Sequence, residues 1–345
     1  MGTLAKLAYD VGAGAKLAFY AAHYGVSRAV SAPLEPSAET TQSNASGPID
    51  RKAVRRAFFD VFQQDRSNIA SGLYSAPDTA TNLALMRRSG AYLRDLDALD
   101  QRRLAKAGTQ VREDPAGAGF PTYYRQNFHW QSGGWLTDQS ADLYDFQVET
   151  LFTGSAAAMR RATALALLAD SLKGCDQRPL VCADIACGTG QFSQDILRNY
   201  PKMRLLACDM SPAYTRKAAR AVAPWSNATA LSGAAEALPL GDGSLDRAVC
   251  IYLFHELPPK VRVQVVGEMA RVIRRGGVLV LADALQTGDN PNLDVMLDAF
   301  PHGFHEPYFT TWLTTDIVAL LSSQGFQLQA TRQAFLTKAW AFERL

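Results

Sequence analysis

Residues 180–193 read LVCADIACGTGQFS, a short apolar run followed by a glycine-rich turn. The apolar run predicts a buried strand that ends at Asp184, and a helix is expected to begin at about residue 191. Between them, Gly188 and Gly190 let a ligand approach the backbone closely, and the helix directs its N-terminal N–H groups at that ligand. The turn by itself is weak evidence for any particular ligand, so the rest of the chain must identify it.

Downstream of this turn, strands and helices alternate regularly. The predicted strands are 180–184, 204–209, 228–231, 246–252, 278–282, 326–330 and 337–342. The predicted helices are 191–199, 212–223, 258–273 and 315–323. Strands separated by helices of about ten residues indicate a parallel sheet that is covered on both faces, with the last two strands pairing at its edge.

Upstream of residue 176 the alternation is missing, and the chain is predicted to be mainly helical. Four regions are expected: an amphipathic helical segment at 1–30, a Ser- and Pro-rich flexible linker at 31–49, a helical cap or substrate region at 50–175 and the sheet domain at 176–345. Within the cap, helices are predicted at 51–64, 80–106, 142–152 and 156–173. Ser155 is expected to cap the last of these helices.

Composition argues against several classes of protein. The 345 residues carry a net charge of +2, and the first 150 hold 16 basic and 16 acidic side chains, so no basic arm for nucleic acid is expected. The five cysteines include no CxxC pair, which favours reduced thiols in a cytoplasmic protein. No apolar run approaches the roughly 20 residues of a membrane span. The helix at 1–30 is expected to dock on its own domain or on a sister chain, as in a homodimer, with peripheral membrane contact as the alternative.

Two acidic residues bear on the ligand of the glycine turn. Asp184 ends the first predicted strand and Asp209 ends the second, so both are expected at the edge where parallel strands bind ligands. Asp209 is placed to accept both hydroxyls of a ribose. A carboxylate beside the turn would repel a pyrophosphate, and Ser193 stands where a dinucleotide fingerprint has a third small residue, Gly or Ala. These features favour S-adenosylmethionine, which has a ribose and an ammonium group but no phosphate.

Four segments in order resemble the motifs of class I S-adenosylmethionine-dependent methyltransferases of the small-molecule type. They read ADIACGTG, LLACDMSP, GAAEALPLGDGSLDRAVCIYLFHELP and RVIRRGGVLVLAD. The resemblance implies an α/β fold, a Rossmann-like seven-stranded methyltransferase sheet with a mainly helical N-terminal extension. Two positions depart from the pattern: Ala186 stands where the family often has Gly, and Ala234 where it often has an Asp that binds adenine.

The resemblance also implies a cofactor and a set of residues that bind it. S-adenosyl-L-methionine is expected to contact Asp184, Ala186, Gly188, Thr189, Gly190, Asp209, Met210, Ala235, Glu236 and Tyr252. The expected reaction is methyl transfer to an oxygen or carbon of a small, aromatic or hydrophobic acceptor. The alternatives are a protein or nucleic-acid methyltransferase and a catalytically silent subunit that only binds the cofactor.

Histidines and aromatic residues are the candidates for the chemistry of the acceptor. His255 follows the fourth predicted strand and is the expected base, with a structural histidine as the equal alternative. The candidates for contact with the substrate are His129, Trp130, His305 and Tyr308. Although His302, His305 and Glu306 carry types of metal ligand, their spacing matches no strong metal motif, and no metal site is predicted. A loop bounded by Pro301 and Pro307 explains that segment equally well.

Overall fold

A sheet of seven strands forms one half of the computed structural model, which describes residues 3–31, 49–77 and 86–345. The strand order is β3-β2-β1-β4-β5-β7-β6, with β7 antiparallel to both of its neighbours. The strands are β1 (Val181–Ile185), β2 (Arg204–Asp209), β3 (Ala228–Ser232), β4 (Leu245–Ile251), β5 (Ile273–Ala284), β6 (Phe326–Ala334) and β7 (Thr337–Arg344). The predicted alternation and the closing strand pair are confirmed, and the seven-stranded Rossmann-like sheet with them.

Helices cover the sheet and build the N-terminal half. Those that follow the first strand are α8 (Gln191–Asn199), α9 (Pro212–Val222), α10 (Pro259–Val272), α11 (Asp294–Gly303), α12 (Phe309–Trp312) and α13 (Ile317–Ser323). Those that precede it are α1 (Thr3–Val30), α2 (Arg51–Ala70), α4 (Ser89–Leu104), α5 (Asp138–Leu151), α6 (Ala156–Arg160) and α7 (Ala166–Ser171). Between α6 and α7 the backbone winds as a π-helix at Arg161–Leu165.

Each face of the sheet buries an apolar layer, as expected for parallel strands covered by helices on both sides. Cys182 of β1 belongs to a core cluster that also contains Leu167 and Ile196, from helices on one face. Ala183, its neighbour in β1, belongs to the opposite cluster with Val265. Successive strand residues point to opposite faces, so a strand that is apolar throughout serves both layers.

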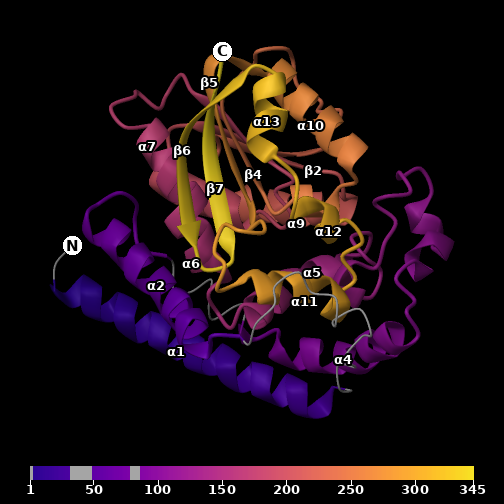
Figure 1. Ribbon diagram of the computed structural model, residues 1–345. Coiled ribbons are helices and arrows are strands. Elements are labelled where there is room, and N and C mark those ends of the chain that lie inside the picture. Colours follow the sequence, from indigo (N-terminus) through magenta and orange to yellow (C-terminus); the bar gives the residue numbers. More distant parts are fainter. Residues whose placement is uncertain (1–2, 32–48, 78–85) are drawn as a thin grey trace.

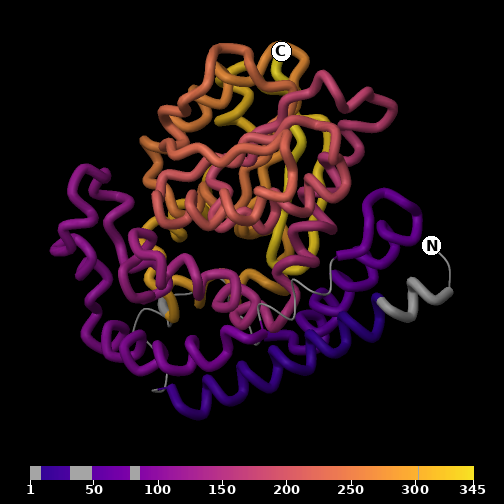
Figure 2. Tube along the Cα trace, turned by 180° about the vertical axis from the view of Figure 1, so that it is seen from behind, coloured from indigo at the N-terminus to yellow at the C-terminus, as the bar shows by residue number. Residues whose placement is uncertain are grey.

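The N-terminal helices lie across the edge where the parallel strands end (Figures 1 and 2). Lys16 of α1 forms a buried ion pair with Glu149 of α5 at 2.9 Å. Asp65 of α2 is fully buried, and its carboxylate binds Arg161 at 2.5 Å and Tyr9 at 2.7 Å. Because an unpaired buried charge is costly, these pairs specify how the helices dock. Among the described residues, no helix combines the length and apolar character needed to cross a membrane.

Several local predictions differ from the structure. Ser155 makes no capping bond; Glu149 accepts the free N–H of Ala157 at 3.0 Å instead. The expected loop around Pro301 is the last turn of α11, where a proline removes only one helix hydrogen bond. Strand β5 begins at Ile273, ahead of the predicted start at residue 278, and it includes Gly276 and Gly277. Of the expected linker 31–49, residues 32–48 lie outside the described part of the chain, as do residues 80–85 of the expected helix 80–106.

Gly190 allows α8 to pack closely on α9, and we predict that Gly190→Ala destabilises the fold. Gly190 has φ +80°, and an added Cβ would lie 3.1 Å from Cα of Ala218. The left-handed conformation alone costs an L-residue about 1–2 kcal/mol. Urea unfolding should therefore show a loss of at least about 1 kcal/mol. Gly241→Ala is the matched control, since nothing lies within 4 Å of a Cβ there; equal losses at both positions would contradict this reading.

Candidate active site

The glycine turn and the end of β2 form the floor of the candidate site. Asp209 accepts a hydrogen bond from the backbone N–H of Gly188 at 2.8 Å and one from the N–H of Ser211 at 2.9 Å. These bonds hold the carboxylate at the carboxyl edge of the sheet. Ala186 has φ +57° and Tyr252 also has φ +57°, so two residues with side chains adopt a conformation that favours glycine. Backbone strain of this kind is often concentrated at functional sites.

A pocket of about 750 Å³, which includes its open mouth, lies above this floor. The residues that line it from the sheet domain include Ala186, Gly188, Asp209, Met210, Ala235, Glu236, Tyr252 and Glu256. The residues that line it from the N-terminal half are aromatic: Tyr123, Tyr124, Phe128, Trp135 and Tyr144. Both halves of the chain therefore build one pocket.

Buried polar contacts fasten the N-terminal wall of the pocket to the sheet domain. Thr189 of the glycine turn donates a hydrogen bond to Asp145 of α5 at 2.5 Å. Ser211, which caps α9, donates to the backbone oxygen of Trp135 at 2.5 Å. Because buried polar groups are costly when unpaired, these bonds set the position of the aromatic wall over the floor.

Two carboxyl groups at the turn have perturbed acidities. Burial raises the pKa of Asp184 to about 7, although Ser193 donates a hydrogen bond to it at 2.5 Å. Burial likewise raises the pKa of Asp209 to about 6, against the opposing effect of its two backbone hydrogen bonds. A ligand that brings positive charge or hydroxyl donors to Asp209 would stabilise the ionised form.

The raised pKa of Asp209 leads to a prediction about pH. Binding of a cationic ligand that needs ionised Asp209 should strengthen as the pH rises through about 6 and then level off, with affinity about tenfold weaker at pH 5 than at pH 7. The stability of the ligand-free fold should change in the opposite sense, falling as the pH rises from about 4 to 7, because the folded state holds this proton more tightly than the unfolded state. Calorimetric titration with S-adenosylmethionine between pH 5 and 8 measures the first effect. A flat profile for the wild-type protein would contradict it.

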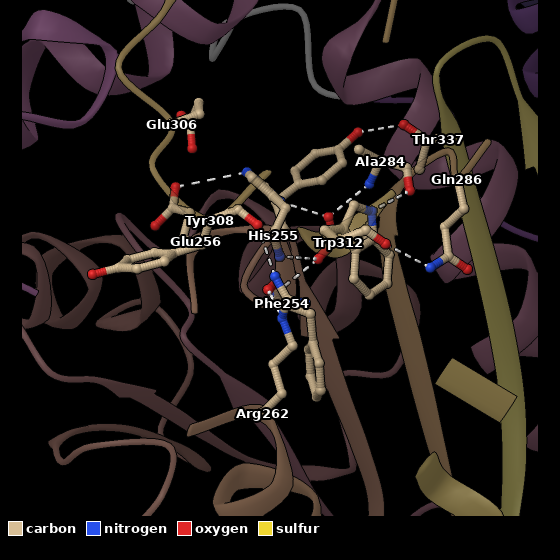
Figure 3. Close-up of polar contacts among 12 residues, drawn as sticks. Phe254, His255, Glu256, Arg262, Ala284, Gln286, Glu306, Tyr308, Trp312 and Thr337 are labelled. Atoms are coloured by element: carbon tan, nitrogen blue, oxygen red, sulfur yellow. Dashed lines mark hydrogen bonds and ion pairs between the residues drawn. The ribbon is translucent and has the colours of Figure 1, made fainter. Parts of the chain in front are cut away.

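His255 is held by a buried carboxylate beside the pocket (Figure 3). It lies in the short helical turn η6 (Phe254–Glu256), and its Nδ1 is 2.5 Å from Oδ1 of Asp283 at the end of β5. Asp283 also accepts the backbone N–H of Phe254 at 2.8 Å, which fixes the turn. Burial disfavours the charged ring, but Asp283, Glu306 and Glu256 together outweigh it and raise the pKa of His255 to about 9.

A second group of polar side chains lies at the same end of the pocket. His129, Glu256 and Glu306 each offer a ligand atom, and these atoms lie within 4.8 Å of one another. His129 adopts φ +52° in the turn η4 (Phe128–Trp130), and burial lowers its pKa to about 3, so that its ring is neutral. Burial raises the pKa of Glu306 to about 7.

The predicted site residues divide into two sets. Those that line the pocket are Ala186, Gly188, Asp209, Met210, Ala235, Glu236 and Tyr252. Those that are not among the lining residues are Asp184, Thr189, Gly190, His255, His129, Trp130, His305 and Tyr308. Several of these support the lining: Tyr308 packs against the aromatic cluster that contains Phe128 and Trp135. His305 instead forms a hydrogen bond with Gln126 at 3.0 Å and packs against Trp130, with the two rings tilted by 41°.

Some residues of the site were not singled out from the sequence. Asp283 is the last residue of the motif RVIRRGGVLVLAD, near the end of a strand, as Asp184 is near the end of the first strand. This position could have marked it as a candidate site residue. Glu256 follows His255 directly, so it could also have been named as a candidate from the sequence. Tyr144 and Asp145 lie within α5, where nothing local distinguishes a pocket residue from a packing residue.

Comparison with known proteins agrees with this geometry. Residues 182–277 match a family model described as a methyltransferase domain. An uncharacterized methyltransferase of Synechocystis is 28% identical over 149 residues, 41% of this chain and 65% of the relative. A tRNA N(3)-methylcytidine methyltransferase of Schizosaccharomyces pombe is 26% identical over 168 residues, 44% of this chain and 66% of the relative. A malonyl-[acyl-carrier protein] O-methyltransferase of Herminiimonas arsenicoxydans is 33% identical over 106 residues, 30% of this chain and 37% of the relative. The chain spans less than two thirds of the length of each of these relatives.

Proposed function

We propose that this chain, whose residues 182–277 match a methyltransferase-domain family model, is an S-adenosylmethionine-dependent methyltransferase that acts on an oxygen or carbon of a small, aromatic or hydrophobic acceptor. One observation carries the proposal. The glycine turn, Asp209 and Tyr252 line a single pocket together with aromatic residues of the N-terminal half. A pocket shared in this way can hold a cofactor against the sheet and an acceptor against the aromatic wall.

The residues present fit the cofactor. Asp209 keeps lone pairs for the ribose hydroxyls beside the two backbone bonds it already accepts. Glu236 has a buried carboxylate oxygen, Oε2, that no hydrogen bond reaches among the described residues. Since the loop has Ala234 in place of an acid, we assign this oxygen to the amino group of adenine. Met210 supplies an apolar contact at the same wall of the pocket.

A small acceptor is favoured by how the pocket is covered. Tyr123, Tyr124, Trp135 and other aromatic side chains of the N-terminal half enclose the pocket on the side opposite the sheet. Such a cover leaves little access for a folded macromolecule, and the net charge of +2 offers no strong attraction for a polyanion. The relationship to a tRNA methyltransferase makes RNA the second candidate, which the experiment below includes.

The chain's own residues would orient the acceptor and handle its proton. S-adenosylmethionine, when bound, supplies an already activated methyl group, so alignment and exclusion of water account for much of the catalytic effect. Asp283 holds Nδ1 of His255, and Nε2, which lies 3.9 Å from Oε1 of Glu256, is the ring nitrogen that would exchange a proton with the acceptor. The hydrogen bond to Asp283 stabilises the protonated ring and so makes Nε2 a stronger base, which becomes available as the pH approaches about 9.

Transfer of a labelled methyl group tests the proposal directly. The full-length protein is incubated with S-adenosylmethionine carrying a radioactive methyl group, in one arm with a small-molecule cell extract and in the other with total tRNA. We expect label to enter the small-molecule fraction and to be absent from tRNA. Label found only in tRNA would replace the small acceptor with RNA, and label in neither arm would favour a subunit that binds the cofactor without chemistry.

A further inference from the structure

Three metal-ligating side chains from separate parts of the chain meet beside the pocket. His129 lies in η4, Glu256 lies in η6, and Glu306 lies in the segment between α11 and α12. Their ligand atoms all lie within 4.8 Å of one another, and Nε2 of His129 is 3.1 Å from Oε1 of Glu306. Figure 3 shows the carboxylates of Glu256 and Glu306 turned towards each other.

Glu306 is an unsatisfied buried carboxylate that points into this group. The residue is only 4% exposed, and neither of its oxygens has a hydrogen-bond donor among the described residues. Glu149, which is buried to a similar degree, pairs with Lys16 at 2.9 Å and accepts the N–H of Ala157. In the described part of the chain, no lysine or arginine forms an ion pair with Glu306 or Glu256. His255, whose Nε2 is 3.9 Å from Oε1 of Glu256, supplies one positive charge to these two carboxylates, and a cation between them would balance the other.

We propose that His129, Glu256 and Glu306 bind one divalent cation of the Mn²⁺ or Zn²⁺ type. Metal–ligand bonds of about 2.0–2.2 Å to His nitrogen and carboxylate oxygen place neighbouring ligand atoms about 3 Å apart and opposite ones a little over 4 Å apart. The His129–Glu306 distance of 3.1 Å corresponds to neighbouring ligands. Imidazole suits transition metals and carboxylates suit harder cations, so the mixed set favours Mn²⁺ or Zn²⁺ over Mg²⁺.

A bound ammonium group is the main competitor for this charge. Its acceptors would stand about 2.8 Å from the nitrogen and, in tetrahedral directions, about 4.6 Å from one another. The 3.1 Å between Nε2 of His129 and Oε1 of Glu306 is too short for two such acceptors and matches neighbouring metal ligands. This distance and the imidazole donor together favour the metal.

The cation would stand at the wall of the proposed acceptor site. Glu256 lines the pocket together with Asp209 and Tyr252, so a cation on its carboxylate faces the same space. Three protein ligands leave coordination positions open for an acceptor oxygen, whose proton a divalent cation makes easier to remove. This role rests on the proposed methyltransferase function, whereas binding of the cation does not depend on it. His305 takes no part, because its ring bonds Gln126 instead.

Cation binding is measured on the full-length protein after treatment with a chelator, by calorimetric titration with MnCl₂ and ZnCl₂ and by electron paramagnetic resonance of bound Mn²⁺. We expect one cation per chain. Glu306→Gln and His129→Asn should each weaken binding by at least about tenfold, the lower end of what loss of a supporting interaction costs a metal site. Asn is chosen at 129 because it tolerates the positive φ there. His305→Asn and the exposed Glu113→Gln are controls that should leave the affinity unchanged.

Two outcomes would overturn the proposal: no binding of either cation by the wild-type protein, or equal binding by the wild type and both ligand variants. Thermal unfolding of each variant shows whether it is folded. If the Glu306→Gln variant does not fold, the cation affinity of a folded His129→Asn protein tests the site instead. The same samples are titrated with S-adenosylmethionine. Normal cofactor binding without cation binding would overturn the metal site alone, whereas loss of cofactor binding in the wild type would count against the proposed function.

Discussion

His255→Asn should slow methyl transfer by about 10²–10⁴-fold, the range that a positioned proton-transfer group contributes, while cofactor affinity stays within about twofold of the wild type. Asn can keep a hydrogen bond to Asp283, which lies 2.5 Å from the imidazole Nδ1 and also accepts the N–H of Phe254. The variant therefore removes Nε2 and leaves the turn that carries the side chain in place. Release of S-adenosylhomocysteine, measured with the acceptor found by methyl labelling, gives the rate.

Calorimetric titration of the same variant with S-adenosylmethionine separates the possible roles of His255. A loss of turnover with unchanged cofactor affinity supports proton handling by the ring. Normal turnover would leave His255 as a structural residue that Asp283 holds in the core. A combined loss of turnover and cofactor affinity would indicate that the substitution disturbs η6, whose Glu256 lines the pocket.

Asp209→Asn should weaken binding of S-adenosylmethionine by about 10–100-fold. A hydrogen bond to a charged group contributes about 1.5–3 kcal/mol, and each 1.4 kcal/mol corresponds to a factor of ten in affinity. Asn retains one acceptor oxygen for the N–H of Gly188 or Ser211, so the turn should remain folded. The loss should arise from the missing carboxylate at the ribose, and it should also abolish the dependence of affinity on pH near 6.

Asp242→Asn is a matched control for this variant. It makes the same chemical change at an aspartate whose side chain is 82% exposed and pairs with Arg271 on the surface. Surface ion pairs contribute little, so cofactor affinity should not change. Equal affinities of Asp209→Asn and the wild type would remove Asp209 from the cofactor site and with it the main reason for assigning this cofactor.

The sheet and the floor of the pocket were predictable because their determinants are local. Apolar strands that alternate with helices predict a covered parallel sheet, and Gly188, Gly190 and Asp209 lie at consecutive strand ends. Even the closing pair of strands β6 and β7 follows from two apolar runs separated by a short turn.

The group of metal-ligating side chains beside the pocket was not predictable, because it depends on tertiary contacts. His129, Glu256 and Glu306 meet from three separate elements, and no spacing in the sequence marks them as neighbours. The adjacent histidine and glutamate at 305 and 306 suggested a shared role, yet the two side chains have different partners. The predicted helix cap was wrong for the same reason. Ser155 had the right residue type and position, but the N–H of Ala157 donates to Glu149 of the preceding helix instead.

The central claim is that the glycine turn holds S-adenosylmethionine and not a dinucleotide. Its most direct test is a calorimetric titration of the full-length wild-type protein with S-adenosylmethionine and, separately, with NAD⁺. We predict that S-adenosylmethionine binds with one molecule per chain and that NAD⁺ shows no binding at millimolar concentration, because Asp184 lies beside the turn that would receive a pyrophosphate and Ser193 stands where a dinucleotide fingerprint has Gly or Ala. Binding of NAD⁺ without binding of S-adenosylmethionine would contradict it.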